Sequence, residues 1–449
     1  MNLCFGRKRT VVVFGAIAVV HLSARVPPTF DSFAKEFTAR YAAMDLEHFT
    51  LDMRERLASV PEADVLALQE RFFLEQRSSL GAFDRTSLDV PQRLLFDLIA
   101  YEVDFQQQRI ALEQRWLKAG RPMPVHGLHD MPEGQAWYQL FVQRFTGTGI
   151  TPDQVFALGE METQRCLYEI DRLRKEIGFA DSASFQRALR DDRFFISDKQ
   201  RVIDGFARVD STVRSRLPAF VGSAEVPEVH AMEWPGAGPN TPPGIYLSRE
   251  DNALNADVFQ FNFYGGRYNS RAMGWIYLHE AIPGHHLQSS LRRQHPPDDL
   301  RAQLLYPGNF EGWACYVEYY GEELGVYDDP YQRLGKWEWD LVRSVRLVLD
   351  AGIHSRGWTH EQALAYWKSH IPGQDAIAER EVTRVTNWAA QALSYKVGAD
   401  RIQRMREAAQ QKLGKGFSAA GFHRAFLDLG MVPITVAERT LAEREIPAR

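Results

Sequence analysis

A short stretch near the middle of the chain contains residue types that could bind a metal ion. It reads HEAIPGHH from His279 to His286. In a common zinc motif, two histidines four residues apart lie on one helical face and hold the ion, while the glutamate after the first histidine activates water. Here Pro283 stands where the second histidine would be, so His285 or His286 would have to supply that ligand. Metal binding therefore requires a distorted helix.

The residues between the histidines predict that distortion. On a regular helix, His285 would be turned about 120° from the face of His279 and displaced by about 9 Å along the axis. Proline lacks a backbone N–H and clashes with the carbonyl four residues earlier, here that of His279, while Gly284 tolerates unusual dihedrals. We expect two residues to loop out and return His285 to the face of His279. His286 is the alternate ligand, because on an undistorted helix it shares that face about 10 Å further along.

A third ligand is expected from a second helix. A catalytic zinc ion commonly takes two histidines and one glutamate, leaving a position for water. Glu311 lies in a segment, residues 309–318, whose apolar residues recur at helical spacing. The proline-containing connection 294–299 leaves room for an antiparallel return of the chain. A glutamate with other glutamates nearby is also typical of a solvated helix face, so this assignment has an alternative.

Four sequence blocks, in this order and spacing, carry a resemblance to a known family. They are HEAIPGHHLQ (279–288), EGWACYVE (311–318), VRSVRLVLDAGIH (342–354) and QALSYKVG (391–398). The chain resembles, over roughly residues 90–445, the bacterial family catalogued as domain of unknown function 885, which is grouped with the gluzincin-type zinc metallopeptidases. The resemblance implies one zinc ion held by His279, His285 and Glu311, with Glu280 as general base. Family members usually have Arg-Tyr where this chain has Arg384-Val385, and Pro-Gly where it has Ala389-Ala390, which predicts a different shape for the C-terminal wall of the site.

Three further residues are candidates for contacts with a substrate. Tyr395 could donate a hydrogen bond to an oxyanion without losing its proton. His354 is the other candidate for this role, although it shares a helical face with Arg346 and Asp350, for which an ion pair is the simplest explanation. Arg384 could bind a substrate carboxylate with two hydrogen bonds, which would favour a carboxypeptidase or dipeptidase.

The amino terminus predicts secretion. Residues 1–24 combine a basic start, an apolar run at 11–20 and small residues near Ala24, which is typical of a cleaved signal peptide. The run is too short to span a bilayer well. A buried N-terminal strand or an uncleaved anchor is the alternative. A secreted or periplasmic protein would retain Cys166 and Cys315, and the sequence leaves open whether they pair.

Composition and element patterning predict a mainly α-helical protein. With 449 residues, 45% of them hydrophobic, and a net charge of -5, the chain can bury a large core and has no feature that suggests nucleic acid as a partner. We expect a helical scaffold at 25–217, a Pro/Gly-rich connection with short strands at 218–271, and a helical catalytic region at 272–449. The strands would form a small β ribbon near the active-site helix, where it could bind an extended peptide, or would simply connect the two lobes.

These observations together predict a bilobal, zincin-like metallopeptidase that acts on short peptides. One alternative is a non-haem iron enzyme, because two histidines and a carboxylate also form iron sites. The other is a helical peptide-binding protein that retains a peptidase-like cleft without catalysis. Nothing in the sequence specifies the oligomeric state.

Overall fold

The predicted mainly helical fold is confirmed. The computed structural model describes residues 29–46, 52–239, 241–295, 299–371 and 375–444, so the predicted signal peptide at 1–24 lies outside the described residues. The helices of the first half are α1 (Phe30–Ala42), α2 (Met53–Ala58), α3 (Ala63–Leu80), α4 (Val90–Lys118), α5 (Gly134–Thr146), α6 (Pro152–Ile177), α7 (Ser182–Ala188) and α8 (Lys199–Val221). Those of the second half are α9 (Met273–Glu280), α10 (His285–Arg292), α11 (Leu300–Gln303), α12 (Pro307–Val317), α13 (Pro330–Arg356), α14 (His360–His370), α15 (Asp375–Asn387), α16 (Leu393–Leu413), α17 (Ala419–Leu427) and α18 (Ile434–Glu443).

Local sequence signals account for where the helices begin. Helix α6 starts at Pro152, whose fixed φ suits the first helical turn and whose missing N–H is not needed there. Thr151 and Gln154 form a reciprocal capping box in front of it, which satisfies backbone N–H groups that the helix leaves unpaired. Helix α6 then packs along the long buried helix α13, which continues toward the candidate site.

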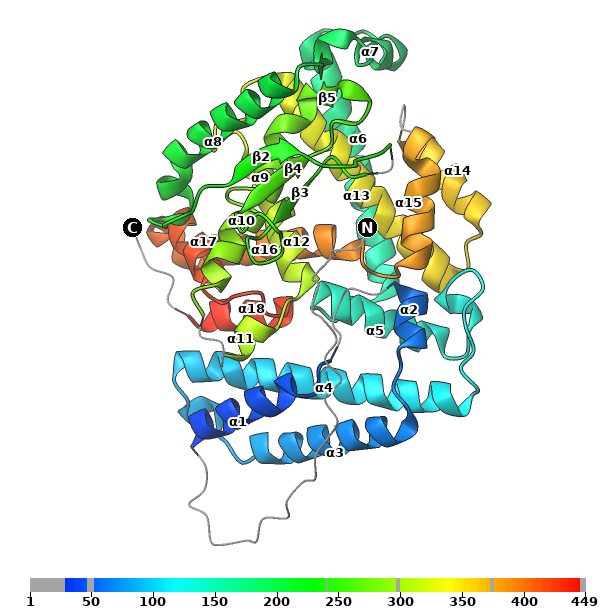
Figure 1. Cartoon of the computed structure of the whole chain (residues 1–449), viewed down its shortest axis with the longest axis vertical. Coiled ribbons are helices and arrows are strands. Elements are labelled where there is room, and N and C mark those ends of the chain that lie inside the picture. The colour runs from blue at the N-terminus through cyan, green and yellow to red at the C-terminus, as the bar shows by residue number, and fades with distance from the viewer. Residues whose placement is uncertain (1–28, 47–51, 240, 296–298, 372–374, 445–449) are drawn as a thin grey trace, which may run out of the picture.

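The helices are arranged around one large core. Figure 1 shows α1, α3 and α4 side by side at one end of the molecule, with α5 and α18 lying against α4. The largest cluster of buried apolar side chains runs from Phe30 to Leu441, so it draws on all three segments distinguished in the sequence. Among the described residues, no helix is both long enough and apolar enough to cross a lipid bilayer.

A small sheet lies at the centre of the fold. Its strands are β2 (His230–Glu233), β3 (Gly244–Leu247) and β4 (Val258–Phe261), in the order β2-β4-β3. Strand β2 runs parallel to β4, whereas β3 runs antiparallel to β4 with Tyr246 opposite Phe259. Two-residue strands, β1 (Phe195–Ile196) and β5 (Tyr268–Asn269), form a separate antiparallel pair. The short strands expected in the 218–271 segment are therefore present, and β3, at one edge of the three-stranded sheet, lies against α9.

Candidate metal centre

The chain breaks its helix between the two candidate histidines. Helix α9 ends at Glu280 and α10 begins at His285, with Ala281 at non-helical dihedrals and a cis peptide bond between Ile282 and Pro283. A Cβ atom at Gly284 would lie 2.0 Å from the carbonyl oxygen of His279, so only glycine fits where the connection folds back over the end of α9. We expected two residues to loop out of a continuous helix. Instead, residues 281–284 separate two distinct helices. The chain cannot continue as one helix, because Pro283 offers no N–H and Gly284 must pass directly over the last turn of α9.

This break brings three potential ligands together. The Nε2 atoms of His279 and His285 lie 3.4 and 3.3 Å from Oε2 of Glu311, and the donor atoms of the three residues all fall within 4.8 Å of one another. All three side chains are buried. Burial alone would raise the pKa of Glu311, but the two imidazoles beside its carboxylate outweigh burial and lower that pKa below its usual range.

The donors fit a tetrahedral ion. Ligand atoms bound at about 2.0–2.1 Å around a tetrahedral zinc ion lie about 3.3–3.4 Å from one another, and both histidine-to-glutamate separations have this value. Within the described part of the chain, Oε2 of Glu311 has no hydrogen-bond partner although it is buried. A buried carboxylate oxygen without a donor is costly, so its position between two imidazoles favours a bound cation.

His286 points away from this cluster. Its Nε2 donates a hydrogen bond to the carbonyl oxygen of Pro227 at 2.8 Å, and its Nδ1 lies 3.4 Å from the hydroxyl of Tyr246. Of the two histidines that the sequence left as alternatives, His285 is the one that the structure groups with His279 and Glu311.

A carboxylate behind His279 fixes the orientation of its ring. Glu318, in the short 3₁₀ turn Glu318–Tyr320 after α12, lies with Oε1 2.7 Å from Nδ1 of His279 and accepts a hydrogen bond from Arg343 on its other oxygen at 2.7 Å. With the Nδ1 proton directed at Glu318, the lone pair of Nε2 faces Glu311 and His285. Sequence reasoning treated Glu318 only as a neighbour of Glu311. Its spacing of seven residues from Glu311, two helical turns, was the signal that could have placed both on one face.

A second group of potential ligands fits a metal ion less well. His279, Cys315 and Glu318 also converge, but on the Nδ1 side of the same imidazole. A guanidinium nitrogen of Arg343 lies 3.3 Å from that Nδ1, and a cation already in this position disfavours a metal ion. Burial also raises the pKa of the Cys315 thiol, which keeps it protonated. Cys315 and Cys166 are both free and buried, so they do not pair.

The candidate general base is held by the edge of the sheet. Oε2 of Glu280 accepts a hydrogen bond from the backbone N–H of Tyr246 at 2.8 Å, on the side of β3 that faces away from β4. Burial raises the pKa of the Glu280 carboxyl, although the nearby imidazoles of His279 and His285 oppose this effect. The short strands thus lie beside α9, the helix of His279, as the sequence predicted.

Close backbone contact between two helices brings Tyr395 to the site. Gly312 on α12 and Gly398 on α16 touch, since a Cβ atom on Gly312 would lie 2.5 Å from Cα of Gly398. Tyr395, one turn before Gly398, stacks parallel to His279 with ring centroids 6.3 Å apart. Burial raises the pKa of its hydroxyl, and the charge of Glu311 raises it further, so the phenol remains a hydrogen-bond donor.

His354 is not positioned to act on a substrate, which corrects one sequence-based expectation. Its Nδ1 accepts a hydrogen bond from the backbone N–H of Leu128 at 3.2 Å, and its Nε2 donates to the carbonyl oxygen of Val385 at 3.0 Å. The ring is fully buried, and burial lowers its pKa to about 4. Both ring nitrogens therefore serve the fold, and neither is available to an oxyanion.

The predicted ion pair between Arg346 and Asp350 is also wrong. Arg346 instead pairs with Glu381 on α15. Asp350 accepts hydrogen bonds from the hydroxyl of Tyr138 at 2.7 Å and from the backbone N–H of Ala390 at 3.0 Å. Spacing along one helix could not reveal these partners, because they come from other helices.

Arg384 lies near Tyr395. Its Nη2 donates a hydrogen bond to the side-chain oxygen of Gln391 at 2.7 Å and lies 3.4 Å from the hydroxyl of Tyr395. The side chain is partly buried.

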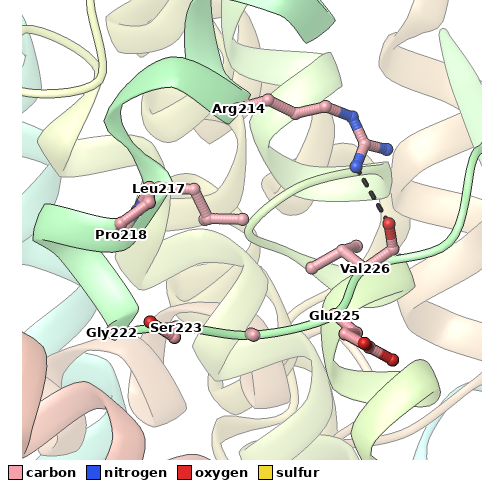
Figure 2. Close-up of a pocket in the computed structure, with 8 residues that line it drawn as sticks. Arg214, Leu217, Pro218, Gly222, Ser223, Glu225 and Val226 are labelled. Atoms are coloured by element: carbon pink, nitrogen blue, oxygen red, sulfur yellow. Dashed lines mark hydrogen bonds between the residues drawn. The ribbon is translucent and has the colours of Figure 1, made fainter.

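A separate cavity of about 410 Å³ opens between the end of α8 and the loop that follows it. Figure 2 shows Arg214 reaching across it to the carbonyl oxygen of Val226. None of the candidate metal ligands lines this cavity. Its lining residues are Arg214, Leu217, Pro218, Gly222, Ser223, Ala224, Glu225 and Val226.

The helical fold and the buried His/His/Glu cluster define a mainly α-helical protein with a candidate metal centre. The chain belongs to the family described as bacterial protein of unknown function (DUF885), whose sequence profile matches residues 100–441. The family resemblance deduced from the four sequence blocks is thereby confirmed. No curated protein matches this sequence significantly.

Two solved structures share the fold. One is described as the "putative lipoprotein" from Colwellia psychrerythraea, with 23% identity, a TM-score of 0.65, and coverage of 92% of this chain and 74% of that one. The other is a "putative lipoprotein of unknown function" from Shewanella oneidensis, with 17% identity, a TM-score of 0.69, and coverage of 92% of this chain and 100% of that one. At these identities the similarity extends to the fold alone.

Proposed function

We propose that this protein is a zinc-dependent peptidase. The observation that carries the proposal is the buried oxygen of Glu311, which lies between the imidazoles of His279 and His285 without a hydrogen-bond donor in the described chain. Two histidines and one glutamate are a common ligand set of catalytic zinc. Glu280, directly after the first ligand, supplies the carboxylate that peptide hydrolysis also requires.

Each residue then has a defined role. When bound, a zinc ion would activate water and polarise the scissile carbonyl group. Glu280 takes a proton from the attacking water and delivers it to the leaving amine. The Tyr246 N–H holds one oxygen of Glu280, and no described residue bonds the other, which is therefore available for the proton.

Tyr395 stabilises the negative charge that develops on the carbonyl oxygen. Its ring stacks on His279, so its hydroxyl lies at the wall of the same site. A neutral phenol donates a hydrogen bond without changing its charge, and such donors contribute most where water is excluded. Glu318 and Arg343 act indirectly, since they hold the His279 ring in place.

We further propose that the protein acts outside the cytoplasm, in the periplasm or after secretion. Residues 1–24 have the pattern of a signal peptide. Two proteins of similar fold are described as "putative" lipoproteins, which agrees with this location.

Metal analysis and peptide hydrolysis test the proposal together. We expect about one zinc ion per chain and hydrolysis of a peptide library that stops with a chelator and returns with zinc. Glu280→Gln should retain zinc but lose at least about 100-fold in turnover, since general-base catalysis contributes that much. His285→Gln should lose zinc, whereas the matched variant His286→Gln should retain it. Bound iron in place of zinc, or full activity of Glu280→Gln at equal zinc content, would show that the proposed mechanism is wrong.

A further inference from the structure

A guanidinium group without a carboxylate partner lies beside the candidate metal centre. Among the described residues, no carboxylate oxygen lies within 4.0 Å of Arg384; the side chain contacts Gln391 and the hydroxyl of Tyr395 instead. Its central carbon lies 5.9 Å from the ring centroid of Tyr395, the ring that stacks on His279. Arg384 is therefore a neighbour of the reacting groups rather than a remote surface residue.

Other arginines of this region form direct ion pairs, and Arg380 shares Glu381 with Arg346. Arg343 pairs with Glu318, and Arg346 pairs with Glu381, both through buried contacts. Arg384 differs from them, because it makes no direct ion pair with a carboxylate of the described chain. Its Nε is buried and has no hydrogen-bond partner within the described chain. A buried N–H without an acceptor is costly, and a guanidinium with such a free N–H is typical of a site whose partner arrives with a ligand.

We propose that Arg384 binds the α-carboxylate of the substrate, so that this protein cleaves peptides close to a free C-terminus. A guanidinium group matches a carboxylate with two parallel hydrogen bonds, and the chain itself supplies no such partner. This inference rests on the proposed peptidase function and adds its substrate class.

The distances limit where cleavage occurs. Arg384 lies 3.4 Å from the Tyr395 hydroxyl, and the Tyr395 ring lies 6.3 Å from that of His279. With the roughly 2.8 Å from the hydroxyl to the centre of its ring included, the guanidinium and the His279 ring are at most about 12–13 Å apart, which an extended peptide spans with about four residues. The bond that is cut lies within about four residues of the C-terminus.

Paired substrates test this assignment. One peptide that the enzyme cleaves is made with a C-terminal carboxylate and again with a C-terminal amide, and kcat/KM is measured for both. The zinc-loaded protein should prefer the acid at least about tenfold. Arg384→Gln should lose that preference because kcat/KM falls for the acid and stays the same for the amide. Arg384→Lys should keep part of the preference. Arg404→Gln, which removes an exposed arginine from α16, is the matched control and should retain the full preference.

The remaining outcomes would overturn either the role of Arg384 or the proposed peptidase function. Equal, zinc-dependent cleavage of acid and amide by the unaltered protein would overturn this inference and leave the peptidase function intact. An equal loss on both substrates in Arg384→Gln would show that Arg384 acts on the reacting groups and not on a carboxylate. No hydrolysis of either substrate, or of the peptide library, by zinc-loaded protein would overturn the proposed function and this inference with it. If Arg384→Gln fails to fold, as thermal unfolding would reveal, the comparison of acid and amide in the unaltered protein and in Arg384→Lys decides the question.

Discussion

Replacing Glu318 by glutamine should weaken metal binding without removing a metal ligand. Glu318 joins Nδ1 of His279 to the guanidinium of Arg343 through two contacts of 2.7 Å each, and both Glu318 and Arg343 are almost completely buried. The amide of glutamine is neutral, so the bond that holds the imidazole loses its charge. The buried cation of Arg343 loses its only carboxylate partner recorded within 4.0 Å in the described chain.

The size of the effect follows from these two losses. Removing the carboxylate behind a metal-bound histidine typically lowers metal affinity about 10- to 100-fold. That range corresponds to about 1.4–2.8 kcal/mol. We expect a value toward the upper end, because an uncompensated positive charge 3.3 Å from the His279 ring also repels the metal ion.

Competition with a chromophoric chelator would measure zinc affinity in the unaltered protein and in Glu318→Gln. Glu323→Gln is the matched control, since it removes an exposed carboxylate five residues away and should leave the affinity unchanged. Thermal unfolding of the zinc-free proteins separates an effect on the fold from an effect on the site. An affinity of Glu318→Gln within twofold of the unaltered protein would refute the assigned role of Glu318.

Three further outcomes are expected. Gly284→Ala should lower the free energy of unfolding by about 1–3 kcal/mol and lower the zinc content, because the new methyl group would meet the carbonyl of His279. Thermal unfolding and metal analysis would measure the two effects. Gly416→Ala is the control and should change neither, because its methyl group would enter open space. His354 has a pKa of about 4 in the fold and about 6.5 when unfolded, so the unfolded chain gains a proton first as pH falls. The contribution of His354 to the free energy of unfolding should drop by up to about 3 kcal/mol from pH 6.5 to pH 4, and the difference between the unaltered protein and His354→Gln in urea titrations measures it. Burial raises the pKa of Asp350 to about 7, so the unfolded chain loses this proton first as pH rises. The stability that Asp350 contributes is therefore present below about pH 4 and lost as pH rises to 7. The loss reaches up to about 4 kcal/mol, and Asp350→Asn should abolish it in the same titrations.

Sequence reasoning grouped the three candidate ligands because they lie in short, recognisable stretches. The types and order of His279, His285 and Glu311 indicated a metal centre, and Pro283 with Gly284 indicated a distorted helix. The extent of the distortion was not predictable, because it depends on how tightly Gly284 passes over the end of α9. The choice between His285 and His286 depended on that same geometry.

The errors arose where partners come from distant segments. His354 shares a helical face with Arg346, and spacing alone suggested functional or ionic roles for both. Its actual partners, Leu128 and Val385, lie 226 and 31 residues away in the sequence. Glu318 was overlooked for a related reason, since only the packing of α13 against the site reveals its bond to Arg343.

The contact between Gly312 and Gly398 constrains how this site can evolve. It joins the helix that carries Glu311 to the helix that carries Tyr395 by direct backbone contact, so any side chain at either glycine would push the two helices apart. Under the proposed function, substitutions that change substrate preference and keep this spacing should therefore lie elsewhere, such as on α15, the helix of Arg384. A directed-evolution library aimed at new substrates would best diversify α15 and keep both glycines constant.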